Sequence, residues 1–450
     1  MIDLHLSFIV MRRKVEYSPQ NMRRIDIAGQ WRRFQILILS CGGLQIRRNG
    51  CNRKIAPFFL PCGEKNVYLP HNMRRLVIVL SAQKQVDMYL WEQMDWPKFH
   101  WDKQRINKVL VDVRHQQGKL LGMAEMLGFD VKSPVVLDAM TSDIIKSSEI
   151  EGIALNADDV RSSVAWQLGI DRVGVPSSDR YIEGVVEVMF DAVHHYDEPL
   201  TQDRLFRWHS ALFPNPIRLA HITVGDWRQG DMQVVSGQYG KEKVHYEAPA
   251  SKDVPQMMSE LLQWINTADT DPVLKAAIAH LWFVSIHPFS DGNGRLARTI
   301  TDMLLAKSDA TPYRFYSMST QIALARKEYY DILEQTQKGT LDITEWLLWF
   351  LGRLDVAIKV AMETVGHTLS KATFWESHRH IAMNERQTKM VNMLWDGFEG
   401  KLTSSKWAKI NKCSPDTALR DLQDLVAKGI LVRTESGGRS TGYDLVKQTI

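Results

Sequence analysis

The sequence predicts a mainly α-helical protein of several domains, and three observations support this prediction. Apolar residues recur at helical spacing through most of residues 103–365, as at Val136, Met140 and Ile144. Runs of strand-forming residues are few and short. The 450 residues have an ordinary globular composition, with 44% hydrophobic and 24% charged residues. This length corresponds to roughly two to four domains.

Most of the expected helices lie between residues 88 and 370. A Trp-rich helical module at 88–133 comes first, and we expect Trp91, Trp96 and Trp101 to pack against the following helices rather than to form a binding platform. The main helical core is expected at 134–370. The expected helices are 103–128, 135–150, 157–167, 179–196, 202–213, 252–268, 271–286, 296–307, 320–337 and 342–364.

One β-hairpin is expected within this helical core. Val234-Val235 and Val244-His245-Tyr246 are short strand-type runs, and Gly237 and Gly240 between them suit a hairpin loop.

Residues 375–450 have the element order of a winged helix-turn-helix domain. Three short helices end with one that begins after Ser414, a suitable N-cap, and has Pro415 at its first position. Two strand-type runs follow as the wing. The third helix of such a domain can enter the DNA major groove, whereas acidic residues on this helix leave protein contact as the alternative. Basic residues that could meet phosphates are Lys406, Lys409, Lys412, Arg420, Arg433 and Arg439.

Residues 1–87 differ from the rest of the chain in charge. They contain 15 Lys and Arg residues against 5 Asp and Glu residues, whereas residues 88–450 contain 41 against 47. A nucleic-acid-binding arm and a targeting segment are two interpretations. We favour a third, in which this basic stretch is a non-native or disordered extension and the functional protein begins near Met88.

Composition argues against two other classes of protein. No run approaches the about 18 apolar residues of a membrane span. The four cysteines lack the paired spacing of a disulfide framework or a zinc site. We therefore expect a cytoplasmic protein with no membrane partner and no transition metal.

Residues 287–298, His-Pro-Phe-Ser-Asp-Gly-Asn-Gly-Arg-Leu-Ala-Arg, are the most informative segment. A glycine inside a helix costs roughly 1 kcal/mol relative to alanine, so Gly292-Asn293-Gly294 indicates a tight loop between two helices. Such a loop aims backbone N–H groups at an anion, and the next helix adds its positive end. Arg295 and Arg298 can reach the same side of that helix. The segment predicts a polyphosphate site with His287 at its edge as a base.

This segment resembles the signature of the Fic family, His-x-Phe-x-Asp/Glu-Gly-Asn-Gly-Arg-x-x-Arg, at every specified position. The resemblance implies a helical core that transfers AMP from ATP to a hydroxyl of a protein side chain and releases pyrophosphate. It implies that His287 accepts the hydroxyl proton, a role that suits an imidazole. It also implies that Asp291 supplies a carboxylate for Mg²⁺ and that Arg298 reaches the γ-phosphate.

The nucleotide is expected to meet the whole loop and the start of the following helix. We also expect the Phe289 side chain to anchor the loop in the core. The predicted nucleotide-binding residues of the motif are Phe289, Ser290, Gly292, Asn293, Gly294, Arg295 and Arg298.

A second motif precedes the first. Residues 147–152 fit the inhibitory pattern of the Fic family, Ser/Thr-x-x-x-Glu-Gly/Asn, with Ser147, Glu151 and Gly152 at its fixed positions. The resemblance implies that Glu151 pairs with Arg298 and takes the place of the γ-phosphate, so that the protein restrains itself. The pattern alone is weak, and its alternative is an exposed acid at a helix C-terminus.

The resemblance also implies that the hairpin is a flap that binds the target by strand addition. An ordinary surface hairpin is the alternative. Tyr329 and Tyr330 are expected near the adenine, although aromatic residues at this spacing are more often part of a core. The expected docking residues of the flap are Val234, Val235, Val244, His245 and Tyr246.

Together these observations give one main hypothesis, a mainly α Fic-type protein adenylyltransferase restrained by Glu151. With ATP and Mg²⁺ it would modify a Ser, Thr or Tyr hydroxyl of a target protein, or of itself. Removal of AMP, or use of another nucleotide such as UTP, is the alternative among enzymes. A DNA-binding regulator with a sensory Fic core is the alternative from another class, and a homo-oligomer is left open.

Overall fold

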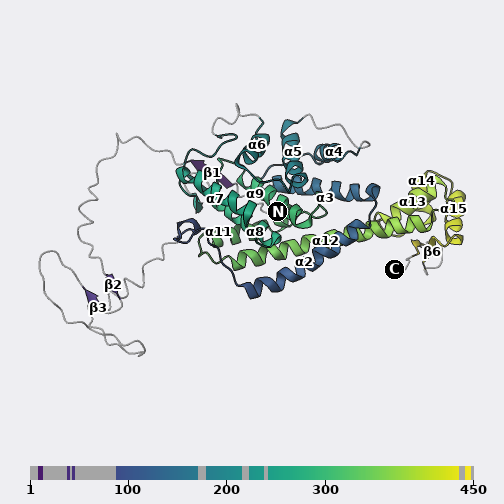
Figure 1. The fold of residues 1–450 in the computed structure, drawn as a ribbon. Helices are drawn as coiled ribbons and strands as arrows, with labels where there is room; N and C mark the ends of the chain where they lie inside the picture. Colours follow the sequence, from purple (N-terminus) through teal and green to yellow (C-terminus); the bar gives the residue numbers. More distant parts are fainter. Residues whose placement is uncertain are drawn as a thin grey trace.

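The computed structural model describes residues 88–170, 179–214, 222–237, 242–434 and 441–446, together with three short strands at 9–13, 38–40 and 43–45. This part of the chain is mainly helical, as predicted (Figure 1). None of its helices has the length and apolarity that crossing a membrane requires.

The helices form one large body with an extension at its C-terminal end (Figure 1). The helices of the large body are α2 (Lys103–Glu125), α3 (Phe129–Ile150), α4 (Ala157–Gln167), α5 (Arg180–His194), α6 (Gln202–Leu212), α7 (Val254–Thr267), α8 (Pro272–Ile286), α9 (Asn293–Asp309), α10 (Met318–Leu324), α11 (Arg326–Gln337) and α12 (Thr344–Ser377). The extension holds α13 (Glu385–Trp395), α14 (Ser404–Asn411) and α15 (Pro415–Ala427). Two single 3₁₀ turns, Leu90–Glu92 and Ser251–Asp253, complete the helical elements of the described chain.

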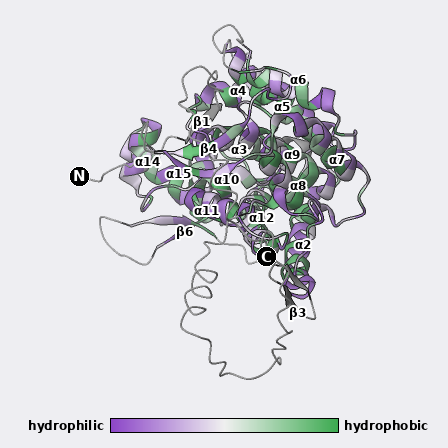
Figure 2. Cartoon of the chain, turned by 90° about the vertical axis from the view of Figure 1, so that its left-hand side faces the viewer, coloured by the Kyte–Doolittle hydropathy of each residue, from purple (hydrophilic) through white to green (hydrophobic). Residues whose placement is uncertain are grey.

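Helix α8 lies at the centre of the large body, packed against α9. It is apolar on all faces, and 13 of its 15 residues are buried. A helix of this kind is stable only when protein surrounds it. Figure 2 shows the same concentration of hydrophobic residues in the inner helices. The loop 287–292 connects the C-terminal end of α8 with the N-terminal end of α9, and this packed pair of helices supports it rigidly.

Two predicted helix boundaries are wrong in an instructive way. The predicted helix 296–307 begins three residues earlier, because Asn293 and Gly294 already have helical geometry and Gly292, with φ 80°, supplies the turn. The predicted helix 320–337 is two helices, separated where Ala325 has φ −108° and ψ 31°. No Gly or Pro marks that break in the sequence.

Helix α12 crosses the predicted boundary between the core and the C-terminal domain. It packs along α2 in the large body and continues to Ser377. Phe374, near its end, is buried in a second hydrophobic cluster together with Trp407 and Leu422 of the extension. The two parts thus share one continuous helix (Figure 1).

The extension has the element order that the sequence predicts for a winged helix. After α15 come the antiparallel strands β6 (Leu431–Arg433) and β7 (Tyr443–Leu445). The Ser414 hydroxyl accepts a hydrogen bond from the Thr417 N–H, as expected of an N-cap. Arg439 lies outside the described residues. The role of the extension in DNA binding stays a prediction.

The predicted hairpin is formed by the antiparallel strands β4 (Met232–Ser236) and β5 (Lys243–Glu247). Gly240 of the expected loop lies outside the described residues. From the basic stretch 1–87, strand β1 (Ile9–Arg13) pairs antiparallel with β4, and β2 (Ile38–Ser40) pairs with β3 (Gly43–Gln45). The rest of that stretch lies outside the described residues, so our expectation of a non-native extension stays untested.

Candidate active site

His287 ends helix α8 in a left-handed conformation, with φ 53° and ψ 58°. Its ring is only 6% exposed but lines a cavity together with Glu151 and Gly294. Nδ1 lies 3.3 Å from the Val284 carbonyl oxygen, so this nitrogen is the donor and Nε2 is the nitrogen suited to accept a proton. Burial, and then the positive charge of Arg228, lower the pKa of His287 to about 4. The imidazole is therefore neutral at physiological pH, as a general base must be.

The loop after His287 is fixed by the Asn293 side chain. Its Nδ2 donates to the Phe289 carbonyl at 2.8 Å, and its Oδ1 accepts the Phe289 N–H at 2.9 Å. The Phe289 ring is fully buried and stacks on His209 with ring centroids 4.2 Å apart. Phe289 and Asn293, both predicted to bind nucleotide, thus use their side chains to hold the loop, and Ser290 is buried.

The two motif arginines point toward different neighbours, not toward one shared side as the sequence suggested. Arg295 donates from Nη1 to the Tyr181 hydroxyl on α5 at 2.7 Å, and its guanidinium lies 5.0 Å from the Phe213 ring centroid. Arg298 instead points toward α3. Both side chains are buried, and one nitrogen of each, Nε of Arg295 and Nη1 of Arg298, has no hydrogen-bond partner within the described chain. Buried donors without partners are costly, which suits a place for an anion.

Arg298 is bound by the end of α3. Its Nη2 donates to Glu151 Oε1 at 2.8 Å and to the Ser147 carbonyl at 2.9 Å, and its Nε donates to the Ser147 hydroxyl at 2.9 Å. Burial by itself lowers the pKa of Arg298, but the Glu151 carboxylate outweighs it and the net pKa is raised. Glu151 is the C-cap of α3, and Gly152 follows with φ 79°.

The Glu151 carboxylate also lies directly on the glycine loop. A Cβ atom added to Gly294 would stand 2.1 Å from Glu151 Oε1 and 3.2 Å from Arg298 Nη1. The carboxylate therefore fills the space over the loop where backbone N–H groups and the α9 N-terminus would attract a phosphate.

The cavity beside His287 has a volume of about 250 Å³ and extends between the hairpin and α11. Tyr329 and Tyr330 both line it. The Tyr329 hydroxyl is hydrogen-bonded to His280 Nε2 at 2.8 Å, which ties this ring to the core. Burial raises the pKa of Tyr330 to about 12, so its hydroxyl keeps its proton. Of the two residues expected near the adenine, Tyr329 is thus held by the core, whereas Tyr330 forms part of the cavity wall.

The hairpin covers this cavity from one side. Val234, His245 and Tyr246 line it, whereas Val235 is buried and Val244 is exposed. The strand register skips His245 between Val235–Val244 and Val234–Tyr246, so this residue forms a bulge. A bulge re-aims a side chain, and His245 Nδ1 lies 2.5 Å from Glu334 Oε2 on α11.

Asp291, the predicted Mg²⁺ ligand, is 50% exposed and lies 3.8 Å from Arg295 Nη2. Within the described residues, no group of three or more acidic, His or Cys side chains could hold a metal ion. A single accessible carboxylate nevertheless fits Mg²⁺ when phosphate oxygens and waters supply the other ligands.

Sequence reasoning missed two buried residues of this site. His209 donates from Nε2 toward the Asp291 carbonyl at 3.2 Å and accepts the Gly225 N–H at Nδ1. Arg228 donates from Nε to the His287 carbonyl at 2.8 Å. Both come from distant segments of the sequence, and neither belongs to a recognisable pattern.

Residues 199–305, which include the loop and both arginines, match the sequence model of the Fic/DOC family. Residues 89–170, which include Glu151, match a domain of unknown function, DUF4172. The chain therefore carries a Fic/DOC-family domain, as its motif predicted.

Named relatives agree with this assignment. Protein adenylyltransferase fic-1 of Caenorhabditis briggsae is 35% identical over 95 residues, which cover 20% of this chain and 18% of that protein. The probable protein adenylyltransferase aq_aa38 of Aquifex aeolicus is 24% identical over 224 residues, 49% of this chain and 62% of that protein. The chain thus spans less than two thirds of the length of these relatives. A crystal structure of a Fic family protein from Desulfovibrio desulfuricans aligns with 76% of this chain and 97% of its own, with 22% identity and a TM-score of 0.46.

Proposed function

We propose that this protein transfers AMP from ATP to a hydroxyl group of a protein side chain and that Glu151 restrains the reaction. The observation that carries the proposal is the contact of Glu151 with both Arg298 and Gly294, because it puts a carboxylate where a bound triphosphate needs its anionic site. A carboxylate and a phosphate compete for the same donors.

The chemistry follows from the side chains around the loop. The target hydroxyl oxygen forms a bond to the α-phosphorus, the bond from that phosphorus to the β-phosphate oxygen breaks, and pyrophosphate leaves. Nε2 of His287 accepts the hydroxyl proton. The loop N–H groups and the arginines stabilise the phosphate charge without reorganisation, which is the main contribution such sites make to catalysis.

Three further features belong to the same proposal. Asp291 would hold Mg²⁺, which neutralises part of the triphosphate charge. The hairpin would bind the target segment, and Tyr330 would face the base. Removing the Glu151 carboxylate would open the anionic site, so that ATP binds with its γ-phosphate at Arg298.

The experiment is transfer of label from α-labelled ATP to proteins of a cell lysate and to the chain itself. We expect Glu151→Gly to raise the rate at least about tenfold, since breaking one charged contact of this kind is worth about 1.5–3 kcal/mol. Glu149→Gly is the matched control, because Glu149 lies on the same helix end but is exposed and pairs with Lys146. Adding His287→Ala to Glu151→Gly should remove the labelling.

Two results would contradict the proposal. Equal labelling by the Glu151→Gly and Glu149→Gly variants would refute the restraint. Absence of label in all variants, together with release of AMP from pre-labelled protein or label transfer from UTP alone, would replace ATP-dependent transfer by one of the alternative reactions.

A further inference from the structure

Arg228 lies inside the protein at 1% exposure and holds the peptide that follows the proposed base. Its Nε donates to the His287 carbonyl at 2.8 Å, and its own backbone N–H donates to the Pro288 carbonyl at 2.9 Å. One residue thus binds two consecutive carbonyl groups of the catalytic loop.

The other end of the guanidinium is bound at the base of the hairpin. Nη1 donates to the Gly230 carbonyl at 2.8 Å, just before β4, and Nη2 donates to the Pro249 carbonyl at 2.5 Å, just after β5. Arg228 therefore connects the base of the hairpin with His287.

Arg228 differs from other buried arginines in having no carboxylate partner within the described chain. Arg204 pairs with Asp191, Arg298 with Glu151, and Arg314 with both Asp302 and Asp309. Burying a cation without an anionic partner is unfavourable. Within the described residues its guanidinium hydrogen-bonds carbonyl groups, and the Asp231 carboxylate acts on it as a nearby charge without a hydrogen bond. This arrangement favours a role in holding the loop.

The backbone of His287 needs such support. A left-handed conformation is disfavoured for a residue with a Cβ atom, and His287 adopts it with φ 53°. Pro288 has no N–H with which this segment could bind itself. The contacts of Arg228 on both carbonyls supply the missing restraint, and with it the direction of the imidazole ring.

The charge of Arg228 acts on the ring as well. After burial, it is the largest influence that lowers the pKa of His287, and the Glu151 carboxylate from α3 opposes it. Burial and the Arg228 charge together outweigh Glu151 and keep the imidazole unprotonated.

We infer that Arg228 is a positioning residue of the transfer reaction, which fixes the backbone of His287 and orients its ring toward the target hydroxyl. The inference rests on the proposed function for the role of His287. It assigns to the segment before the hairpin a role in catalysis that acts through His287.

The test compares Arg228→Met and Arg228→Lys in the Glu151→Gly background. Met removes the charge and the side-chain donors. Lys keeps the charge, but it lacks the planar fork of separate nitrogens that reaches the His287, Gly230 and Pro249 carbonyls together. Arg204→Met is the matched control, because Arg204 is equally buried but binds Asp191 away from the loop. The readouts are kcat, KM for ATP, the melting temperature, and the pKa of His287 measured by NMR of labelled histidine.

We expect kcat to fall about 100-fold in both Arg228 variants with little change in KM, since a small displacement of a reacting group costs about that much. The pKa of His287 should rise in Arg228→Met and stay low in Arg228→Lys. Arg204→Met should lower the melting temperature and change neither quantity.

The inference would be overturned if kcat fell only in proportion to the fraction of unfolded protein and the pKa of His287 were unchanged in Arg228→Met. If the Glu151→Gly protein itself transfers no label, the proposed function fails. The NMR readout does not depend on activity, so it still decides whether Arg228 controls His287.

Discussion

At the scale of single residues, the restraint depends on how tightly Glu151 fits the loop. Its carboxylate contacts Arg298 and lies on Gly294 at the same time. The second contact is possible only because position 294 has no Cβ atom. Under the proposed function, Gly294 would serve two states, a restrained one with the carboxylate over it and an active one with a phosphate in the same place.

This leads to a prediction for Gly294→Ala. The added Cβ atom would meet Glu151 Oε1 at 2.1 Å, so the carboxylate must leave its position. We expect the free energy of unfolding to fall by about 1–3 kcal/mol, the usual cost of overpacking, as measured by urea denaturation. Because a Cβ atom also fills the phosphate place, activity should not rise as it does in Glu151→Gly.

Two controls separate this clash from the general effect of alanine. In the Glu151→Gly background the clash is absent, so Gly294→Ala should cost much less stability there. Gly352→Ala on α12 meets no atom within 4 Å and should stabilise the protein by about 1 kcal/mol. Equal costs of Gly294→Ala in both backgrounds would show that Glu151 does not rest on the loop.

The sequence indicates residues of this site where they are close together in the chain. His287 and Arg298 belong to one contiguous motif, and Ser147 and Glu151 are one helical turn apart, so their partnership follows from spacing and resemblance. Arg228 and His209 reach the same loop through the tertiary fold alone. Their backbone partners are carbonyl and N–H groups that every residue has, and such contacts leave no pattern in a sequence.

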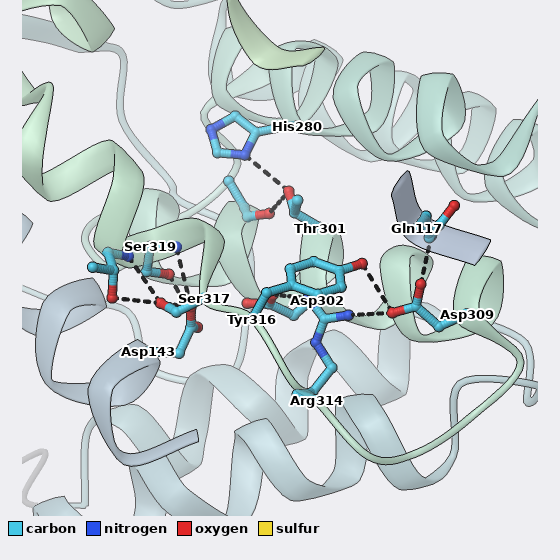
Figure 3. A network of polar contacts seen from close by, with 12 residues as sticks. Gln117, Asp143, His280, Thr301, Asp302, Asp309, Arg314, Tyr316, Ser317 and Ser319 are labelled. Atoms are coloured by element: carbon cyan, nitrogen blue, oxygen red, sulfur yellow. Dashed lines mark hydrogen bonds and ion pairs between the residues drawn. The ribbon is translucent and has the colours of Figure 1, made fainter. Parts of the chain in front are cut away.

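At the scale of elements, α3 and α9 each carry a buried acid one turn from the contact between Glu151 and Arg298. One turn from Ser147, Asp143 of α3 accepts hydrogen bonds from Ser319 N and Oγ at 3.0 Å, at the start of α10 (Figure 3). One turn from Arg298, Asp302 of α9 accepts from Arg314 Nη2 at 3.1 Å. The helix of the proposed restraint, α3, thus lies against a buried network of acids.

This network contains more negative than positive charge. Arg314 also binds Asp309 at 2.9 Å, so one guanidinium serves two aspartates, with Asp143 beside them (Figure 3). Burial, and then the Asp143 carboxylate, raise the pKa of Asp302 well above its ordinary value. Its uncharged form is therefore the one that suits the folded protein.

Asp302→Asn tests this charge balance. An acid whose pKa is raised in the folded protein contributes its stability fully below the ordinary pKa. This stability is lost by about 1.4 kcal/mol per pH unit as pH rises from the ordinary pKa to the raised pKa, and the loss ends there. Asparagine mimics the uncharged acid at every pH. We expect the variant to lose less stability than the wild type between pH 5 and 9, as measured by urea denaturation.

Asp309→Asn is the matched control on the same helix. Asp309 accepts from Arg314, Tyr316 and Gln117, so an amide would place donors against donors. Asp309→Asn should lower the free energy of unfolding by roughly 3 kcal/mol, the usual result of breaking a buried ion pair. If the free energy of unfolding of Asp302→Asn depended on pH as strongly as that of the wild type, Asp302 would be ionised in the folded protein.

Helix positions could be predicted well at this scale, whereas their ends could not. The apolar spacing that predicts α8 is unambiguous because α8 is buried on all sides. The break at Ala325 has no local signal, since it results from how α10 and α11 pack against different neighbours. Likewise, Gly294 reads as a loop residue by propensity but is helical because the Asn293 side chain fixes the preceding turn.

At the scale of the whole molecule, α12 joins the large body to the C-terminal extension. The sequence predicted a boundary at 370–375, between the helical core and the winged-helix element order, but the helix continues to Ser377. Phe374 packs on the extension while Val365 is buried in the main core. The shared helix therefore restricts how the two parts can move.

The acids of α15 bear on whether that ligand is DNA. Asp421 is buried and bound by Arg386 at 2.8 Å and by Asn384 at 3.0 Å. Asp424 accepts from Gln387 and Lys428. Asp421 thus faces its own domain, whereas Asp416 and Asp424 are exposed, as are Lys406, Lys409 and Arg420. Of the three acids on this helix, Asp421 therefore does not oppose DNA binding.

We therefore predict salt-dependent binding of the full chain to duplex DNA through this basic surface, Lys406, Lys409 and Arg420. Each bound phosphate contributes about −0.9 to the slope of log K against log salt concentration, so replacing all three residues by Glu should make the measured slope less negative by about two to three. Lys98→Glu, Lys252→Glu and Lys327→Glu, exposed lysines on the large body, form the matched control for net charge. The slope is read from fluorescence anisotropy at several salt concentrations. If both triple variants change it equally, binding reflects the charge of the whole protein, and the extension is a protein-contact module instead.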